Sequence, residues 1–336
     1  MADALRVALI GTGRIGRVHA ATLARTDGVE LAVVCDVDTA RAEAVAAAYG
    51  GAVATDPGLV IGSADVDAVV IASPTATHVD LLGQAVEAGV PALCEKPIDL
   101  DIARVDALRE RAAAATAPVM VGFNRRFDPH FAALRARVAA GEIGHLEHLA
   151  VTSRDPAPPP VAYVAVSGGI FRDMTIHDLD MARWFVPDIV SVTATGLRQF
   201  DDEIAGTGDY DAAVLTLVGA GGESVVITNS RHSAYGYDQR LEAFGSDGLL
   251  SVGNVTDTVV RFSGATASEV GEPFQNFFLE RYAAAYEREL AAFVSAVRGA
   301  DVVVPGFEDG RAALVLADAA LLSAREGRRV DVDLAR

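Results

Sequence analysis

The stretch "RVALIGTGRIGRVHAATL", residues 6–23, constrains the fold more than any other part of the chain. A short apolar run leads into Gly11, Gly13 and Gly16, spaced as G-x-G-x-x-G, and then into a helical segment. Asp36 closes the next apolar run, 20 residues after Gly16. A glycine triplet alone is a weak signal, but strand, glycine loop, helix and acidic residue in this order are typical of a dinucleotide-binding βαβ unit. The pattern predicts a Rossmann fold.

The rest of the chain divides into two kinds of pattern. Apolar runs at 66–73, 91–97 and 117–123 alternate with helical stretches, which predicts a doubly wound, mainly parallel sheet. After residue 123, longer strand-like runs follow one another, among them "DAAVLTLVG", "ESVVITNSR" and "DTVVRFSG". We therefore expect an α/β chain with a Rossmann domain at 1–123 and an α+β domain at 124–336 that contains a large, mainly antiparallel open sheet.

Composition excludes several classes of protein. The 336 residues carry a net charge of −18, with no basic stripe for a nucleic acid. No apolar run approaches the ~20 residues that would span a bilayer. The two cysteines, Cys35 and Cys94, lie in apolar runs and suit a reducing compartment. We expect a cytoplasmic protein that binds neither nucleic acid nor membrane.

The cofactor is expected to be NAD. The glycines allow a pyrophosphate to approach the backbone at a helix N-terminus, and Asp36 would accept hydrogen bonds from ribose hydroxyls. A carboxylate at this position repels the 2′-phosphate of NADP, although Arg41 lies close enough in sequence to receive one. His78 is either a ligand contact or a solvated residue at a helix start. The expected cofactor-binding residues are Gly11, Gly13, Arg14, Ile15, Gly16, Asp36, Ser73, Pro74, Thr75, His78 and Glu95.

Lys96 is the only lysine among 28 basic residues, so every other positive side chain is an arginine. A biased composition explains the abundance of arginine but not the single exception. Lysine is a compact charge whose proton affinity responds to its surroundings, whereas arginine stays charged. Because "CEKP" ends a predicted strand, Lys96 is expected at the sheet edge near the nicotinamide. The alternative is a surface lysine at a strand end.

The segment "GGIFRDMTIHDLDMARWF", residues 168–185, concentrates titratable groups at the start of a predicted helix. Asp173 and His177 are four residues apart, so on an α-helix they project within ~40° of each other. They form an acid–base pair, a metal site together with Asp180, or a solvated helix start. No metal is expected, because no second cluster of histidine or cysteine accompanies them. Asp178 is expected to be solvated.

Five motifs carry a family resemblance: "GTGRIG", "EKP", "GFNRRFDP", "SRDPAPPP" and "SGGIFRDMTIHDLDMARW". Together they resemble the glucose–fructose oxidoreductase/inositol dehydrogenase family over essentially the whole chain, and its myo-inositol 2-dehydrogenases in particular. The resemblance implies a second domain that binds substrate and supports a homotetramer. It also implies a catalytic set of Lys96, Asp173 and His177.

Alcohol oxidation by such an enzyme needs a base that takes the hydroxyl proton, while the carbon that bears this hydroxyl transfers a hydride to the nicotinamide. His177 is the expected base, because histidine exchanges protons near neutral pH. Asp173 would orient its ring, and Lys96 would stabilise the reacting oxygen. The expected polyol contacts are Asn124, Arg125, Asp155, Asp180, His232, Tyr235 and Tyr237.

The leading hypothesis is oxidation of myo-inositol to an inosose, with NAD reduced, as a step of myo-inositol catabolism. Within the same class, the substrate is alternatively scyllo- or chiro-inositol or an aldose. From a different class, the chain would be a nicotinamide-binding sensor without turnover.

Overall fold

The computed structural model describes residues 4–335, which form two compact units. The first unit runs to Phe127 and also contains Ala284–Leu314. The second comprises Asp128–Ala283 and the chain from Val315 onward. The end of the first segment lies close to the expected boundary at 123, but 284–314 joins the first unit, whereas the prediction placed it in the second domain.

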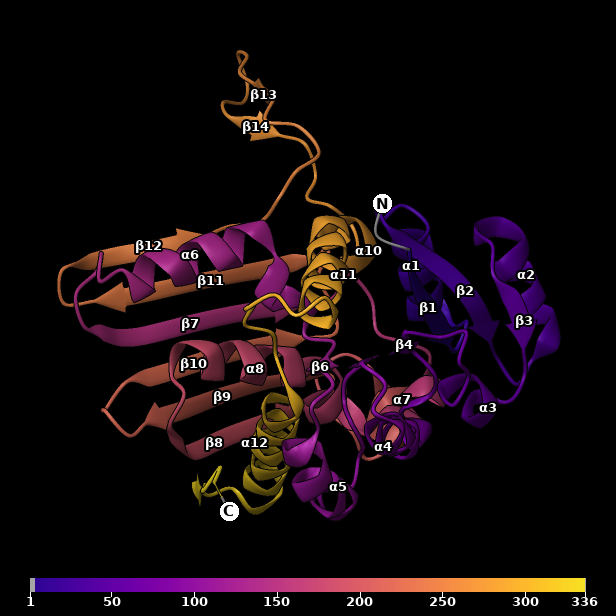
Figure 1. The fold of residues 1–336 in the computed structure, drawn as a ribbon. Helices are drawn as coiled ribbons and strands as arrows, with labels where there is room; N and C mark the ends of the chain where they lie inside the picture. The colour runs from indigo at the N-terminus through magenta and orange to yellow at the C-terminus, as the bar shows by residue number, and fades with distance from the viewer. Residues whose placement is uncertain (1–3, 336) are drawn as a thin grey trace. The chain divides into compact units, whose positions relative to one another are not determined.

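The first unit contains a six-stranded parallel sheet in the order β3-β2-β1-β4-β5-β6 (Figure 1). Every strand pairing in it is parallel, and the chain changes direction across the sheet at β1, as in doubly wound folds. The strands are β1 (Leu5–Ile10), β2 (Val29–Cys35), β3 (Ala52–Ala54), β4 (Ala68–Ile71), β5 (Ala92–Cys94) and β6 (Val119–Val121). The predicted Rossmann architecture is confirmed.

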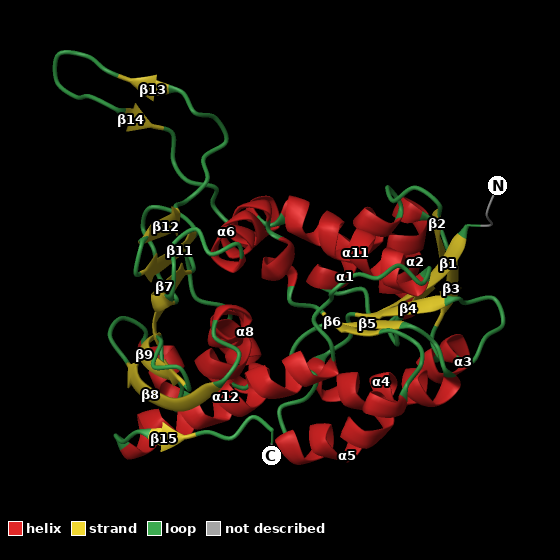
Figure 2. Cartoon of the chain, turned by 60° about the vertical axis from the view of Figure 1, so that its left-hand side comes forward, coloured by secondary structure: helices red, strands yellow, loops and turns green. Residues whose placement is uncertain are grey.

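Helices cover both faces of this sheet (Figure 2). On one face, α1, α2 and α11 bury apolar side chains in a core shared with the strands. On the other, α4 packs against β4, β5 and its neighbours α3 and α5. The helices are α1 (Arg14–Leu23), α2 (Thr39–Tyr49), α3 (Pro57–Ile61), α4 (His78–Ala88), α5 (Ile102–Ala114) and α11 (Ala283–Val297).

Helix α11 explains why 284–314 belongs to the first unit. Leu290, Phe293 and Val294 are buried in the same apolar core as Leu9 and Val34. Apolar residues recur every three to four positions over 278–297, which is typical of an amphipathic helix, and the structure forms this helix in two pieces, α10 (Phe278–Arg281) and α11. Periodicity identifies an apolar stripe, but it does not specify which sheet the stripe will cover.

The second unit contains a seven-stranded sheet in the order β12-β11-β7-β10-β9-β8-β15 (Figure 1). Its pairings are antiparallel except for that of β7 with β10, so the predicted mainly antiparallel sheet is confirmed. The strands are β7 (Leu146–Arg154), β8 (Ile189–Leu197), β9 (Ala212–Gly219), β10 (Ser224–Ser230), β11 (Asp238–Gly245), β12 (Gly248–Val252) and β15 (Val330–Asp331).

Helices pack on one face of the second sheet, where α6 contacts β12 and α8 contacts β7. Residues alternate along the strands between buried and exposed, and Val214, Val226 and Phe244 are among the exposed ones. The remaining α-helices are α6 (Pro129–Ala139), α7 (Val161–Ser167), α8 (Ile176–Phe185), α9 (Asp202–Gly206) and α12 (Phe307–Glu326). Helix α12 begins in the first unit and ends in the second. Among the described residues, no helix is both long and apolar enough to cross a membrane.

The run "DTVVRFSG" does not join the large sheet, which corrects the prediction for it. Only β13 (Arg261–Phe262) is a strand there, and it pairs with β14 (Val270–Gly271) in a separate ribbon. Both views show this ribbon projecting from the second unit (Figures 1 and 2). Val259, Val260 and Phe262 are exposed on it. A β-branched, apolar sequence favours extended backbone but does not decide which strand it pairs with.

Candidate functional site

The carboxyl ends of β1, β4 and β5 meet along one edge of the parallel sheet. The backbone N–H of Ala72 donates to the carbonyl of Ile10 at 2.7 Å, and that of Glu95 donates to Ile71 at 2.9 Å. The glycine loop, the segment that begins at Ser73 and the Glu95–Lys96 turn therefore emerge side by side. This edge of an open α/β sheet is where ligands bind.

Glycine is favoured at the three positions of the loop for different structural reasons. Gly11 has φ +95°, and a Cβ there would lie 2.4 Å from the backbone nitrogen of Ser73. A Cβ on Gly16 would lie 2.0 Å from the carbonyl oxygen of Gly11, so both positions require glycine for packing. A Cβ on Gly13 would meet nothing within 4 Å. Gly13 is the N-cap of α1 and provides no side-chain cap, and the N-terminal end of a helix favours a bound anion. This loop fits the pyrophosphate of a dinucleotide.

Replacing Gly13 by Ala is expected to weaken NAD binding at least tenfold without changing the melting temperature by more than a few degrees. The added methyl group meets no protein atom, so it opposes only the close approach of a pyrophosphate. Titration with NAD, followed by fluorescence or calorimetry, measures the effect. Gly62→Ala is the matched control, because its Cβ would be 3.7 Å from its nearest neighbour. Unchanged affinity in the Gly13 variant would contradict the assignment.

Asp36 is held as a carboxylate at the end of β2. Its Oδ2 accepts hydrogen bonds from the backbone N–H of Thr12 at 2.8 Å and from the Thr12 hydroxyl at 2.6 Å, and its Oδ1 accepts from the backbone of Asp38. Partial burial opposes ionisation, but these hydrogen bonds outweigh it and lower the pKa of Asp36. Arg41, the residue that would favour NADP, forms an ion pair with Asp38 at 3.1 Å.

Sequence reasoning did not identify Thr12, which ties the glycine loop to Asp36. Its position inside the motif gives no signal, because the middle residues of G-x-G-x-x-G are free to vary in type.

His78 is not a solvated helix start, which corrects one of the two alternatives. Its side chain is buried, with Nε2 2.7 Å from the carbonyl oxygen of Ser73 and Nδ1 2.8 Å from that of Pro97. The ring therefore connects the loop after β4 to the turn that carries Lys96. Both of its nitrogens face backbone carbonyls, so its role is to fix the two loops. The Ser73 hydroxyl lies 2.6 Å from that of Thr77, and Pro74 and Thr75 lie at or near the surface.

Glu95 is buried, and its predicted contact with the cofactor stays a prediction. It is 8% exposed, and Nε2 of the buried His19 donates a hydrogen bond to its Oε1 at 2.7 Å. Lys96, the next residue, is half-buried. The direction of Glu95 follows from tertiary packing, because the strand ends at Cys94 and alternation no longer fixes the side chain.

Asp173 and His177 lie on either side of a junction between two helix types, which corrects the prediction of an ordinary helix. Phe171–Thr175 forms a π-helical turn that continues directly into α8 at Ile176. Such turns are rare in α-helices and concentrate at functional sites. Both side chains are half-buried, and the Tyr163 hydroxyl of α7 donates a hydrogen bond to Oδ1 of Asp173 at 3.0 Å. Tyr163 was not identified from the sequence.

Asp178 is fully buried, so the prediction that it is solvated was wrong. Its Oδ2 accepts a hydrogen bond from Nδ2 of Asn229 at 2.7 Å, and Oδ1 of Asn229 accepts one from Thr175 at 2.7 Å. This chain joins the helix to β10. Because buried carboxylates need hydrogen-bond donors, Asp178 serves as a structural anchor for the segment that carries His177. Asp180 is also buried.

The expected polyol contacts fall in different environments. Asp155 is half-buried and His232 is exposed against the ring of Phe200. Tyr235 is 47% exposed and donates a hydrogen bond to Asp238, whereas Tyr237 is buried edge-on to Tyr282. The two candidates in the first unit, Asn124 and Arg125, are both buried in a 3₁₀ turn. Tyr237 packs as a core residue. The alternation of apolar and polar residues near the start of a strand does not show whether such a side chain is buried in the core or lines a pocket.

Two family models match the chain. Residues 5–123 match the oxidoreductase family with an NAD-binding Rossmann fold, and residues 131–251 match the GFO/IDH/MocA C-terminal domain. An inositol 2-dehydrogenase of Rhizobium meliloti is 45% identical over 332 residues, which cover 98% of this chain and 99% of that protein.

Solved structures share the whole fold. A myo-inositol dehydrogenase from Corynebacterium glutamicum is 55% identical with a TM-score of 0.94, covering 98% of this chain and 99% of that one. A scyllo-inositol dehydrogenase from Lactobacillus casei, solved with bound NAD(H) and scyllo-inositol, is 28% identical with a TM-score of 0.87 and covers 99% of this chain and 100% of that one.

Proposed function

Because this chain belongs to the GFO/IDH/MocA oxidoreductase family and carries its NAD-binding Rossmann fold, we propose that it is an inositol 2-dehydrogenase whose substrate is myo-inositol. One ring hydroxyl is oxidised to a ketone, which yields an inosose and NADH. The enzyme acts in the cytoplasm, in the catabolism of myo-inositol.

The observation that carries this proposal is the π-helical turn before α8. It places one carboxylate, Asp173, and one imidazole, His177, in half-buried positions on a segment that Asp178 anchors from within. Oδ1 of Asp173 accepts a hydrogen bond from the Tyr163 hydroxyl. This bond orients the Asp173 carboxylate before a substrate binds. A half-buried acid–base pair on an anchored helix suits proton removal from an alcohol.

The glycine loop and Asp36 would hold NAD, which would supply the acceptor for the hydride from the carbinol carbon. His177 takes the hydroxyl proton at the same time, and Asp173 orients the imidazole and stabilises its protonated form. Lys96 donates a hydrogen bond to the reacting oxygen and stabilises its developing negative charge. Asn124, Arg125, Asp155, Asp180, His232 and Tyr235 are the residues that we propose for the remaining hydroxyls, and Tyr237 supports them from the core.

The uncovered face of the second sheet supports a homotetramer as the working assembly. Val214 on β9, Val226 on β10 and Phe244 on β11 are 42%, 37% and 41% exposed. Apolar side chains gathered on one sheet face are typical of an interface between protein chains.

NADH formation with a panel of polyols tests the function. The purified protein is supplied with NAD and myo-, scyllo- or chiro-inositol or glucose, and absorbance at the NADH band is followed. We expect the highest kcat/KM with myo-inositol, and a lower one with NADP in place of NAD because Asp36 is ionised. A higher value for another polyol would move the assignment to that substrate, and no turnover despite NAD binding would favour a sensor.

A further inference from the structure

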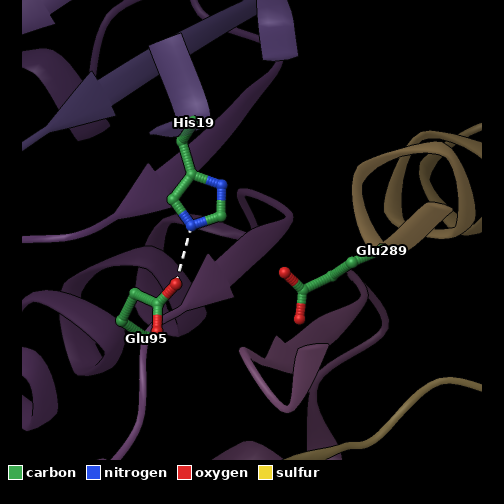
Figure 3. A group of neighbouring side chains, drawn as sticks. All are labelled: His19, Glu95 and Glu289. Atoms are coloured by element: carbon green, nitrogen blue, oxygen red, sulfur yellow. Dashed lines mark hydrogen bonds and ion pairs between the residues drawn. The ribbon is translucent and has the colours of Figure 1, made fainter. Parts of the chain in front are cut away.

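A cluster of three metal-ligating side chains lies inside the first unit and shares no residue with the predicted acid–base segment (Figure 3). His19 comes from α1, Glu95 follows β5, and Glu289 comes from α11. His19 and Glu289 are fully buried, and Glu95 is 8% exposed. One ligand-type atom of each residue lies within 4.8 Å of those of the other two. Within residues 4–335, no other three side chains of His, Cys, Asp or Glu come so close.

Glu289 lacks the hydrogen bonds that a buried carboxylate needs. Its side chain points towards His19 and Glu95 (Figure 3), and neither carboxylate oxygen has a hydrogen-bond partner among residues 4–335. Buried carboxylates are hydrogen-bonded or coordinate a metal, because removal from water without a partner costs free energy. The two free oxygens therefore face a place where a cation would satisfy both of them.

His19 and Glu95 form the more firmly held half of the cluster. Nε2 of His19 lies 2.7 Å from Oε1 of Glu95, and the His19 ring packs edge-on against Tyr286 with 5.8 Å between ring centroids. Gly122 confines Glu95 from another side, since a Cβ there would lie 3.0 Å from its carboxylate. Two neighbouring ligand atoms on one zinc ion, each bonded at about 2.1 Å, lie about 3–3.5 Å apart. The pair therefore needs to open by less than about 1 Å to hold an ion in place of the proton that the two atoms share.

The third ligand is within reach of the same ion. Atoms that are each bonded to zinc at about 2.0–2.2 Å cannot be more than about 4.4 Å apart. The limit of 4.8 Å that the three residues meet is only slightly larger. A small rotation of the Glu289 side chain, which no hydrogen bond restrains at its carboxylate, is enough to complete the site.

We infer that His19, Glu95 and Glu289 bind a divalent transition-metal ion, and that Zn²⁺ fits their ligand atoms best. Imidazole nitrogen and carboxylate oxygen are both zinc ligands, whereas Mg²⁺ and Ca²⁺ prefer oxygen alone. With both oxygens of Glu289 bound, the cluster supplies four donor atoms, the number of a closed structural zinc site. Two carboxylates balance the charge of the ion. The proton of Nε2 moves to Nδ1, so the imidazole stays neutral.

The ion has a structural role, because it joins α11 to the N-terminal part of the first unit. Helix α11 belongs to 284–314, which returns to this unit late in the chain, whereas His19 and Glu95 precede residue 127. Three ligands from distant segments do not form a site in the unfolded chain, so the ion stabilises the folded state. The inference goes beyond the proposed function and does not depend on it, because its tests need no substrate.

The metal content of the purified protein tests the site directly. The protein is produced in zinc-supplemented medium, exchanged into metal-free buffer and analysed by inductively coupled plasma mass spectrometry. We expect about one zinc ion per wild-type chain. Glu289→Gln removes a charged ligand with little change in size and should lower this content at least about tenfold. A wild type that carries no divalent metal, or a Glu289→Gln variant that retains it, overturns the inference.

Two controls locate the ion. Glu287→Gln changes an exposed residue of the same helix, which pairs with Arg25 at 3.3 Å, and should keep the zinc. His177→Gln should also keep it. Loss of zinc in the His177 variant, with zinc retained in Glu289→Gln, would place the ion at the acid–base segment and contradict the site proposed for it.

Thermal unfolding measures the effect of the ion on stability. Zinc chloride added to protein freed of metal by a chelator should raise the melting temperature of the wild type and of Glu287→Gln by about 3–6 °C at a hundredfold excess over Kd. It should leave Glu289→Gln unchanged. Without metal, Glu289→Gln should be at least as stable as the wild type, because it removes a buried carboxylate that has no partner. An equal rise in Glu289→Gln means that zinc binds elsewhere on the protein, and this rejects the site.

Discussion

Replacing His177 by Gln is expected to lower kcat for myo-inositol by about 10²–10⁴-fold, the usual contribution of a general base. Glutamine keeps a polar group of similar reach but does not accept a proton from an alcohol near neutral pH. Binding of NAD uses the glycine loop of the other unit and should be unchanged, so the NAD-induced shift in melting temperature should persist. Stopped-flow measurement of NADH formation in a single turnover separates the chemical step from product release.

The control for this variant is His130→Gln. His130 is an exposed residue at the start of α6 in the same unit as His177. The His130→Gln variant should oxidise myo-inositol at the wild-type rate. Wild-type turnover in His177→Gln would exclude His177 as the base and return the segment to a structural role.

Replacing Lys96 by Arg is expected to lower kcat by about 10²–10³-fold, although the positive charge is kept. This is the typical loss on removing one donor that stabilises a developing oxyanion. Arginine presents a planar fork rather than a compact ammonium group, and its donors lie further from the backbone. Lys96 is half-buried at the strand end beside the buried Glu95, which limits how far a larger group can move aside. Rates at saturating NAD and polyol measure the effect.

Arg111→Lys is the control, because it makes the converse exchange at a position of the same unit that is outside the proposed site. Arg111 lies on the surface of α5, where it pairs with Glu87. Its rate should equal that of the wild type, which shows that arginine–lysine exchange is not itself damaging. Near-normal turnover in the Lys96→Arg variant would mean that catalysis does not require a lysine at this position.

The predictions that the structure confirmed depend on local order in the chain. The parallel sheet, the change of direction at β1 and the place of Asp36 next to the glycine loop follow from a strand, a turn and a helix that are consecutive in sequence. The predictions that failed concerned the direction of single polar side chains. Asp178 was expected to be solvated, as was His78 in one of its two alternatives, and both side chains turn inward.

Those errors share a physical cause. A polar residue is buried only where another part of the chain supplies a hydrogen-bond partner, and that part is usually distant in sequence. Asp178 is buried because Asn229 on β10 donates to it, and His78 because the carbonyls of Ser73 and Pro97 both face its ring. No spacing rule within a helix contains this information.

By itself, the sequence determined the Rossmann unit and the nature of its cofactor, because glycine conformation and the charge of Asp36 act within one βαβ segment. It also singled out Lys96, Asp173 and His177 by residue type. Only the tertiary structure decided that Asp173 and His177 lie at a π-helical turn, and that Glu289 packs against His19 and Glu95. An apolar stripe on α11 shows that the helix is buried, but only the sheet that it covers determines which charged groups meet beneath it.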